Sequence, residues 1–243
     1  MNNRKTSKGV LDERYASERL RKPELIFRYK TRARLVYNCV KKYTGRVSGI
    51  SLLDFGAAEG LTLLELNNLL NDSNLIGVEF SKELLMKAPV MPANVELKEG
   101  DVTSLPADIP DESFDIVCAL ALLEHLPQPV RAIKEAKNKL KTGGIFVATS
   151  PSPFWDNVST KLGLLREDQH ETDMNRRLMK QMIRDAGMEV ITFDRFMFTP
   201  VAFLPYLKLK ISPSFSLSVD KIVSRLKIFN WLFVNQVIIG RKK

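Results

Sequence analysis

The chain has 243 residues, of which 44% are hydrophobic, and a formal net charge of +9. This size allows one well-buried domain with elaborations and is too small for two full domains. Residues 1–8 are polar and basic, so we predict that the chain has no signal peptide. The sequence contains no run of about 18 apolar residues, so we predict no membrane span. Cys39 and Cys118 lack metal-ligand spacing, which favours a reduced, cytoplasmic setting without zinc or disulfide.

The net positive charge lies at the two ends of the chain. Residues 1–50 carry a net charge of +10, residues 51–195 a net charge of −8, and residues 196–243 a net charge of +7. This asymmetry favours an acidic partner for the basic ends, although solvated basic faces are an alternative. We predict four regions, which are a basic helical extension over 1–45, a core over 46–195, a basic and aromatic-rich insertion over 196–231, and a final strand with a basic tail over 232–243.

The first predicted element is a helix over residues 23–43. Its apolar residues, among them Leu25, Tyr29, Val36 and Val40, recur at helical spacing with arginines and lysines between them. This pattern predicts an amphipathic helix with one basic face.

The segment from Leu52 to Gly60 joins an apolar run to an acidic, glycine-spaced turn. Residues 50–55 are typical of a buried strand and residues 59–70 of the helix that follows. Glycines 56 and 60 let the backbone turn sharply and approach a ligand. This is the first βα unit of a doubly wound sheet, in which nucleotides bind beyond the carboxyl end of the strand. A dinucleotide fingerprint would need glycines at 56, 58 and 61, but Ala58 and Leu61 occupy the second and third places, and the Lys-Ser or Lys-Thr of a P-loop is absent.

Further strands follow in the order that such a sheet requires. Residues 74–79 predict a strand that ends in Glu79, whose carboxylate suits the two hydroxyls of a ribose. Phe80 is placed to cover an adenine face, and Ser81 to cap a helix over 82–87. A third strand over 94–98 leads to Asp101. The remaining predicted core elements are a strand over 113–118, a helix over 130–140, a strand that reaches residue 147, and a helix over 175–186.

The pattern Asp54-x-Gly56-x-x-x-Gly60, followed in order by Glu79 and Asp101, resembles the class I S-adenosylmethionine-dependent methyltransferases of the small-molecule, quinone-pathway-like type. The resemblance covers residues 45–195 and implies S-adenosyl-L-methionine as cofactor. It also implies an α/β fold with a Rossmann-like, seven-stranded, mostly parallel sheet, helices on both faces and an antiparallel last strand.

The resemblance carries over to individual residues. Asp101 would receive the adenine amino group and the Val102 amide a ring nitrogen, while the N-terminal helix would lie over the cofactor site as a lid. The full set of cofactor-binding residues that the resemblance and the turn imply is Asp54, Gly56, Ala57, Ala58, Gly60, Glu79, Phe80, Asp101, Val102, Ala119 and Leu120.

The two histidines are the candidate catalytic residues. His170 lies in the loop after the fifth strand, where many family members place a histidine at the mouth of the site. His125 follows the fourth strand in a Glu-His-x-Pro pattern similar to that of quinone-pathway O-methyltransferases. Each also suits a positioning or loop-stabilising role. Ala121 stands where those enzymes have an additional glutamate that completes a metal site, so we predict no metal.

The predicted last strands, 188–193 and 233–239, form an antiparallel hairpin whose connection is far longer than a hairpin loop. The connection holds an apolar, aromatic stretch over 196–211 and a helix-like stretch over 217–229. Long insertions at a sheet edge usually carry function, which favours an acceptor pocket or contact with an anionic membrane. Simple coverage of the sheet is the alternative.

The predicted function is methyl transfer from S-adenosylmethionine to an oxygen of a small-molecule or lipid-linked acceptor, in the cytoplasm or peripherally on the inner face of the membrane. The loop from Ala119 to Leu123 lacks the Asn-Pro-Pro-Tyr type of motif, and no Pro-Cys pair offers a nucleophile, which argues against DNA as substrate. Two alternatives stay open. One is an RNA methyltransferase whose basic arms bind phosphates, and the other is a catalytically silent cofactor-binding protein.

Overall fold

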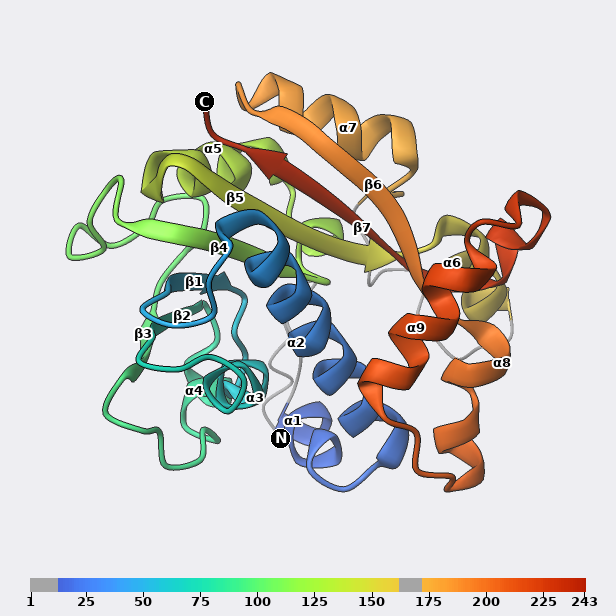
Figure 1. Ribbon diagram of the computed structural model, residues 1–243. Coiled ribbons are helices and arrows are strands. Elements are labelled where there is room, and N and C mark those ends of the chain that lie inside the picture. Colours follow the sequence, from blue (N-terminus) through green and yellow to red (C-terminus); the bar gives the residue numbers. More distant parts are fainter. Residues whose placement is uncertain (1–12, 162–171) are drawn as a thin grey trace, which may run out of the picture.

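The computed structural model describes residues 13–161 and 172–243, which form one seven-stranded sheet with helices on both faces (Figure 1). The strands are β1 (Ser51–Phe55), β2 (Asn74–Glu79), β3 (Val95–Glu99), β4 (Phe114–Leu120), β5 (Leu140–Pro151), β6 (Glu189–Phe198) and β7 (Phe233–Arg241). Their order across the sheet is β3-β2-β1-β4-β5-β7-β6. Only β7 runs antiparallel to its neighbours, β5 and β6, among these strands. The predicted α/β fold is confirmed.

Helices of different length connect the strands. The α-helices of the described residues are α1 (Glu13–Arg19), α2 (Pro23–Thr44), α3 (Leu61–Asn67), α4 (Lys82–Leu85), α5 (Pro129–Lys139), α6 (Pro153–Lys161), α7 (Arg176–Asp185), α8 (Thr199–Ala202) and α9 (Pro213–Val223). Short 3-10 helices occur as η1 (Leu123–His125), η2 (Leu204–Leu207) and η3 (Lys227–Leu232).

The hydrophobic core has one layer on each face of the sheet. On one face α2 and α3 pack against β1, β4 and β5, with Val36 and Leu63 among the fully buried residues, and α9 joins them through Leu217. On the other face α5 and α7 pack through Ile133 and Ile183. The central strands are therefore covered twice, which is why their sequences are apolar runs rather than alternating patterns.

The observed helix α2 agrees with its sequence signals. Pro23 occupies the first helical position, where its missing N–H costs no hydrogen bond, and Gly45 ends the helix with a left-handed φ of 72°. The buried side of α2 carries Ala33, Val36 and Val40 against the sheet. The helix predicted over 23–43 is thus a layer of the core as well as an extension.

Three other elements differ from their predicted bounds. The helix predicted from 59 begins at Leu61, because Gly60 has a left-handed φ of 82° and belongs to the turn. Strand β6 continues to Phe198, since Phe196 and Met197 remain buried against the core. The helix predicted over 217–229 instead begins at Pro213, where the Ser212 hydroxyl accepts a hydrogen bond from the Phe215 amide, and ends at Val223.

The structure bears on the two cysteines and on the question of a membrane span. Cys39 and Cys118 are buried and free, and burial raises the pKa of the Cys39 thiol to about 12. None of the helices within 13–161 and 172–243 has the length and apolar character needed to cross a membrane.

Candidate cofactor site

The glycine turn after β1 is the centre of the candidate site. The amides of Gly56 and Ala57 both donate to the Val78 carbonyl of β2, at 2.8 and 3.1 Å, so the turn bends over the end of the neighbouring strand. Gly56 has a φ of 70°, and a Cβ there would lie 2.8 Å from Leu122 Cδ1. A Cβ on Gly60 would lie 2.3 Å from Met91 Cε. The left-handed backbone at Gly56 and Gly60, with φ of 70° and 82°, therefore favours glycine at both positions, while the contacting ends of the Leu122 and Met91 side chains could move aside.

Ala58, between the two glycines, also has a left-handed backbone, with a φ of 51°. This conformation costs a residue with a Cβ about 1 kcal/mol. Ala121, which directly follows β4, has a φ of 56° and is held by a hydrogen bond from its amide to the Thr149 carbonyl. Strained residues of this kind cluster at functional sites, and here two of them stand at the carboxyl ends of adjacent strands.

Glu79 ends β2 with both carboxylate oxygens fixed by backbone amides. The Ala58 amide donates to Oε2 and the Ser81 amide to Oε1, each at 2.8 Å. Glu79 therefore ties the glycine turn to the start of α4. A carboxylate offers about four lone-pair positions, so two remain for hydroxyl groups of a ligand. The geometry suits the ribose role predicted for this residue.

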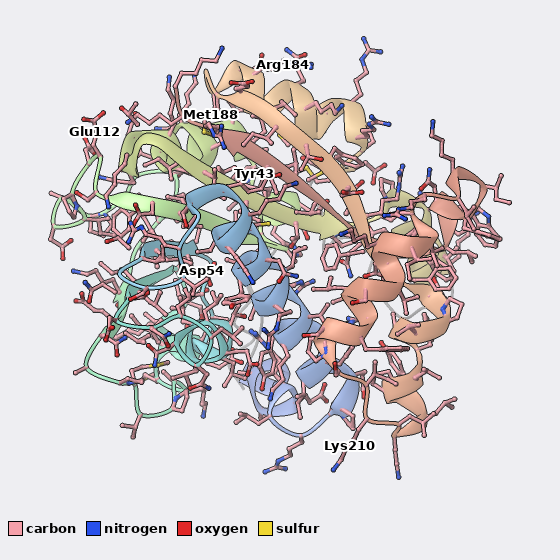
Figure 2. The ribbon with its side chains drawn as sticks, in the orientation of Figure 1. Tyr43, Asp54, Glu112, Arg184, Met188 and Lys210 are labelled. Atoms are coloured by element: carbon pink, nitrogen blue, oxygen red, sulfur yellow. The ribbon has the colours of Figure 1, made fainter. Side chains whose placement is uncertain are left out.

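Asp54 lies inside the molecule beside α2 (Figure 2) and is 2% exposed. Its Oδ1 atom has no hydrogen-bond partner among the described residues. Burial raises the pKa of this carboxyl from 3.8 to about 7, which the positive charges of Arg19 and Arg32 oppose and the negative charge of Glu79 reinforces. A buried carboxylate with an unsatisfied oxygen is costly, and a ligand that brings a positive charge or a donor would relieve that cost.

Sequence reasoning missed a buried ion pair beside the turn. Arg19 of α1 donates to Glu59 at 3.2 Å, and both side chains are almost fully buried. Burial raises the pKa of Glu59, while the charge of Arg19 lowers it. The acidic character of the turn was visible in the sequence, but nothing distinguishes Arg19 from the other basic residues of the first 50. Its partner stands 40 positions further along the chain.

Helix α1 lies directly against the turn. Ala16 packs with Ala58 and Leu84 in a small buried cluster, and Arg19 lies over the Tyr29 ring at 5.7 Å from its centroid. Helix α2 supports α1 through Tyr29 and packs on the sheet face. A lid of the predicted kind would therefore involve both helices, and α1 is the one that contacts the turn.

The predicted adenine-contacting residues follow β2 and β3. Phe80 is 64% exposed, which leaves its ring available to a ligand. Asp101 is exposed, and its Oδ1 accepts 2.7 Å hydrogen bonds from the amide and hydroxyl of Thr103, while the Val102 side chain is buried. These residues stand at the carboxyl ends of β2 and β3, which are paired up to Glu79 and Glu99.

The remaining predicted residues follow β4 or lie beyond the described ranges. Ala119 is buried and Leu120 half-buried at the end of β4, which pairs with β1 as far as Phe55. His125 is the last residue of η1, at the same end of the sheet, and is half-buried. His170 lies outside the described residues. Among those that are described, no three His, Cys, Asp or Glu side chains form a group that could hold a metal ion.

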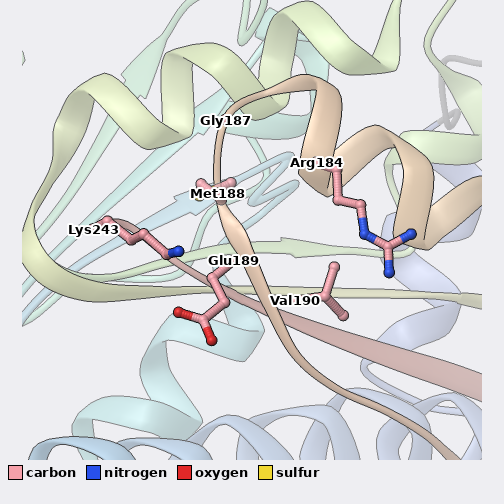
Figure 3. A pocket seen from close by; sticks show the side chains of 6 residues that line it. All are labelled: Arg184, Gly187, Met188, Glu189, Val190 and Lys243. Atoms are coloured by element: carbon pink, nitrogen blue, oxygen red, sulfur yellow. The ribbon is translucent and has the colours of Figure 1, made fainter.

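A separate pocket lies at the opposite end of the sheet, where β6 begins and β7 ends (Figure 3). Its lining residues are Arg184, Gly187, Met188, Glu189, Val190 and Lys243. None of these residues was predicted to bind the cofactor, and none stands at a carboxyl end of β1, β2 or β4. The pocket is therefore not part of the candidate site.

The fold and this site define a class of protein. The strand order with its single antiparallel strand, the glycine turn after β1 and the acid at the end of β2 are those of a class I methyltransferase domain. Residues 53–148 match the family model described as a methyltransferase domain, and they lie in a sheet whose strand order is that of the class I type.

Relatives and solved structures agree with this assignment. A probable S-adenosylmethionine-dependent methyltransferase of Mycolicibacterium smegmatis is 24% identical over 190 residues, which are 76% of this chain and 64% of the relative. A chloroplastic 2-methyl-6-phytyl-1,4-hydroquinone methyltransferase of Oryza sativa is 32% identical over 44% of this chain and 33% of its own. The chain thus spans less than two thirds of the length of these relatives. The structure of a methyltransferase from Thermotoga maritima has a TM-score of 0.63 at 19% identity, covering 95% of each chain, which shows the shared fold.

Proposed function

We propose that the chain is an S-adenosylmethionine-dependent methyltransferase that acts on a small-molecule or lipid-linked acceptor, at an oxygen atom. The observation that carries the proposal is Asp54, a buried carboxyl with an oxygen that no described residue satisfies. S-adenosylmethionine carries positive charge on its sulfur and amino groups. A positive charge or hydrogen-bond donor of this cofactor would therefore satisfy the Asp54 carboxylate.

The donor set around the turn fits the whole cofactor. Glu79 would accept the ribose hydroxyls with the lone pairs that its backbone partners leave free. Phe80 would cover the adenine, and Asp101 would accept its amino group through the carboxylate oxygen that Thr103 does not use. Asp54 would balance the positive charge, since an opposite charge nearby favours the ionised carboxylate.

Bound S-adenosylmethionine supplies a methyl group that is already activated by the positive sulfur. The chain's own residues then have two tasks, which are to hold the acceptor in line with that methyl group and to exclude water. Ala16 and Arg19 of α1, buried against the turn, serve the second task. His125 and His170 remain the candidates to take a proton from an acceptor hydroxyl, as the sequence predicted.

The acceptor class is supported by a relative and by the insertion. The name of the Oryza sativa relative gives that protein a hydroquinone with a phytyl chain as substrate, which combines ring hydroxyls with a long apolar tail. In this chain α8 and α9 follow the carboxyl end of β6, at the same end of the sheet as the candidate site. Both features favour an acceptor with an apolar part.

Transfer of a radiolabelled methyl group into a fractionated cell extract tests the proposal. We expect the wild-type chain to label the lipid or the polar-metabolite fraction, and the Asp54→Asn variant to label neither. Asp72→Asn, a change of the same kind in the exposed turn before β2, is the matched control and should keep the labelling. Label in RNA would support the alternative of an RNA methyltransferase. Cofactor binding without label in any fraction would support a silent cofactor-binding protein.

A further inference from the structure

The segment between β6 and β7, residues 199–232, exposes an unusual number of large apolar side chains. It forms α8, η2, α9 and η3 along one edge of the molecule, beside α6 (Figure 1). Leu207 is 71% exposed, Ile222 64% and Ile228 75%. Leu209, Phe215 and Leu226 are each more than half exposed. Large apolar side chains that are exposed in such number on one segment point to an interaction site in a folded protein.

Aromatic side chains join the segment to α6. The Phe154 ring contacts Trp155 and Trp231, at 5.5 and 5.8 Å between centroids, and the Phe203 ring stacks on Tyr206 at 5.2 Å. The Trp155 indole also donates to the Trp231 carbonyl at 2.7 Å. The Phe154, Phe203, Tyr206 and Trp231 side chains are each roughly half exposed. Amphipathic aromatic side chains of this type are enriched at membrane–water interfaces.

The exposed charge of the segment is entirely positive. Lys208, Lys210, Lys221, Arg225 and Lys227 are all exposed, and Lys210 lies on the outer edge of the molecule (Figure 2). Within the described parts of the chain none of the five forms an ion pair. The one acid of the segment, Asp220, is 3% exposed and accepts hydrogen bonds from the amides of Met197 and Phe198.

We propose that this surface docks on a membrane that carries anionic lipid. Apolar side chains at the level of the headgroups, with lysines and arginines around them, are the features of proteins that lie in the interface plane. Lysine stems extend along apolar surface while the ammonium groups reach the lipid phosphates. The charge complementarity of five cations without an exposed acid commits the surface to an anionic partner.

Two other occupants fit the surface less well. A symmetric contact with a second copy of the chain would bring the same lysines and arginines face to face. Nucleic-acid interfaces are more polar than this one and use few exposed aliphatic side chains. The protruding Leu207, Ile222 and Ile228 have a favourable environment only in an apolar phase.

Docking at this edge would orient the candidate cofactor site. Strands β1, β2, β4, β5 and β6 all run in the same direction, so the segment that follows β6 lies at the end of the sheet that carries the glycine turn. The membrane surface would then lie on the side from which an acceptor enters. The docking itself does not depend on the proposed methyl transfer.

Co-sedimentation of the full chain with vesicles tests the proposal. We expect binding to phosphatidylcholine vesicles that contain about a third phosphatidylglycerol and much weaker binding to pure phosphatidylcholine. The triple variant Lys208→Gln, Lys210→Gln, Lys221→Gln should lower the partition coefficient by about 100-fold. The variant Leu207→Ser, Ile228→Ser should lower it by about tenfold while keeping every charge. All five positions are exposed, and circular dichroism would verify that both variants are folded.

A matched control uses the second basic face of the molecule. Helix α7 carries the exposed Arg177 and Arg184 and the half-buried Lys180 away from the apolar surface, and their triple change to glutamine should leave vesicle binding within about threefold. Equal losses in the two basic variants would overturn the proposal, because non-specific attraction would then explain the binding. Wild-type binding that is absent, or unchanged by Leu207→Ser and Ile228→Ser, would also overturn it. The proposal would also be overturned if the wild-type chain did not bind vesicles but associated with itself or bound RNA, and if the same variants abolished that association or binding.

Discussion

The two basic regions of the molecule use their charge in opposite ways. In the N-terminal region the cations pair with acids of the core, through Arg19–Glu59 at 3.2 Å, Lys30–Glu65 at 3.5 Å and Arg46–Asp115 at 3.0 Å. In the segment 199–232 five cations are exposed and form no ion pair with any described residue. Net charge alone would give both regions an external partner. The pairing shows that acids of the core partly balance the N-terminal charge, whereas no described residue forms an ion pair with the five cations of the segment.

The difference extends to how each region is attached. Helix α2 packs on the sheet with a continuous apolar face, whereas the segment packs on the core through Ala202 and Leu217 and leaves several large apolar side chains exposed. The Thr199 hydroxyl donates to the Leu232 carbonyl and so joins the two ends of the segment. The N-terminal region is therefore a structural part of the site, and the segment is an attached surface. The following predictions test this contrast.

The largest effect is expected at Arg19. Replacing it with methionine leaves Glu59 buried without its cation, which should lower the free energy of unfolding by about 3–5 kcal/mol. The folded-state pKa of Glu59 would rise further, so the loss should be full near pH 8 and shrink toward pH 5 as the carboxyl is protonated. Urea unfolding at several pH values measures this. Arg19→Lys should restore part of the stability, and a loss below about 1 kcal/mol in Arg19→Met would contradict the account.

Asp54→Asn should stabilise the chain without cofactor. The pKa of Asp54 is raised from 3.8 to about 7, so its favourable contribution is present in full below about pH 4 and is lost as the pH rises through 7. Asparagine avoids the buried charge, which should raise the free energy of unfolding near pH 8 by about 2–4 kcal/mol. The gain should vanish near pH 4. Thermal unfolding across this range is the measurement, and a variant less stable than wild type near pH 8 would contradict the role given to Asp54.

The segment should loosen when its buried acid is removed. Asp220→Ala leaves the Met197 and Phe198 amides without their acceptor at the end of β6, where Met197 has a strained φ of 61°. We expect a local cost of about 2 kcal/mol, visible as faster hydrogen exchange of these two amides, with protection in α2 unchanged. Equal loss of protection in α2 would show that the segment and the core unfold as one unit.

The smallest effects are expected for single surface cations. Lys221→Gln should change the free energy of unfolding by less than about 0.5 kcal/mol, because Lys221 is exposed and forms no ion pair with a described residue. Lys30→Gln removes a half-exposed pair with Glu65 and should cost about 0.5 kcal/mol. Unfolding in low and high salt separates the two, since only the loss at Lys30 should shrink with salt.

The parts of the fold that were predictable are those with a local signal. The period of the apolar residues, the glycine turn and the acid after β2 each depend on a few neighbouring positions, and the parallel sheet follows from their order. The end of β6 was not predictable, because it depends on the Asp220 carboxylate, which accepts hydrogen bonds from the Met197 and Phe198 amides. The start of α3 was not predictable either. The apolar spacing alone extends this helix back to residue 59, but Gly60 has a left-handed φ and belongs to the turn.

The candidate site divides in the same way. Asp54 and Glu79 were predictable because their position near the carboxyl end of an apolar strand determines where they lie. Arg19 was not, because its partner Glu59 is distant in the sequence and the surrounding residues are equally basic. That the cations of the segment form no ion pair with a described residue was not predictable either, since pairing is a property of the packed structure.

Cofactor titration of a Glu79 variant tests the central claim, that the turn after β1 and the carboxylate after β2 form an S-adenosylmethionine site. Glu79→Gln removes charge from a residue that holds the turn through the Ala58 amide, and Glu99→Gln makes the same change at its exposed partner position on β3. By calorimetry with S-adenosylmethionine we expect a loss of affinity of about 10- to 100-fold for Glu79→Gln and less than about twofold for Glu99→Gln. Equal affinity in wild type and Glu79→Gln, or no binding to the wild-type chain, would contradict the assignment.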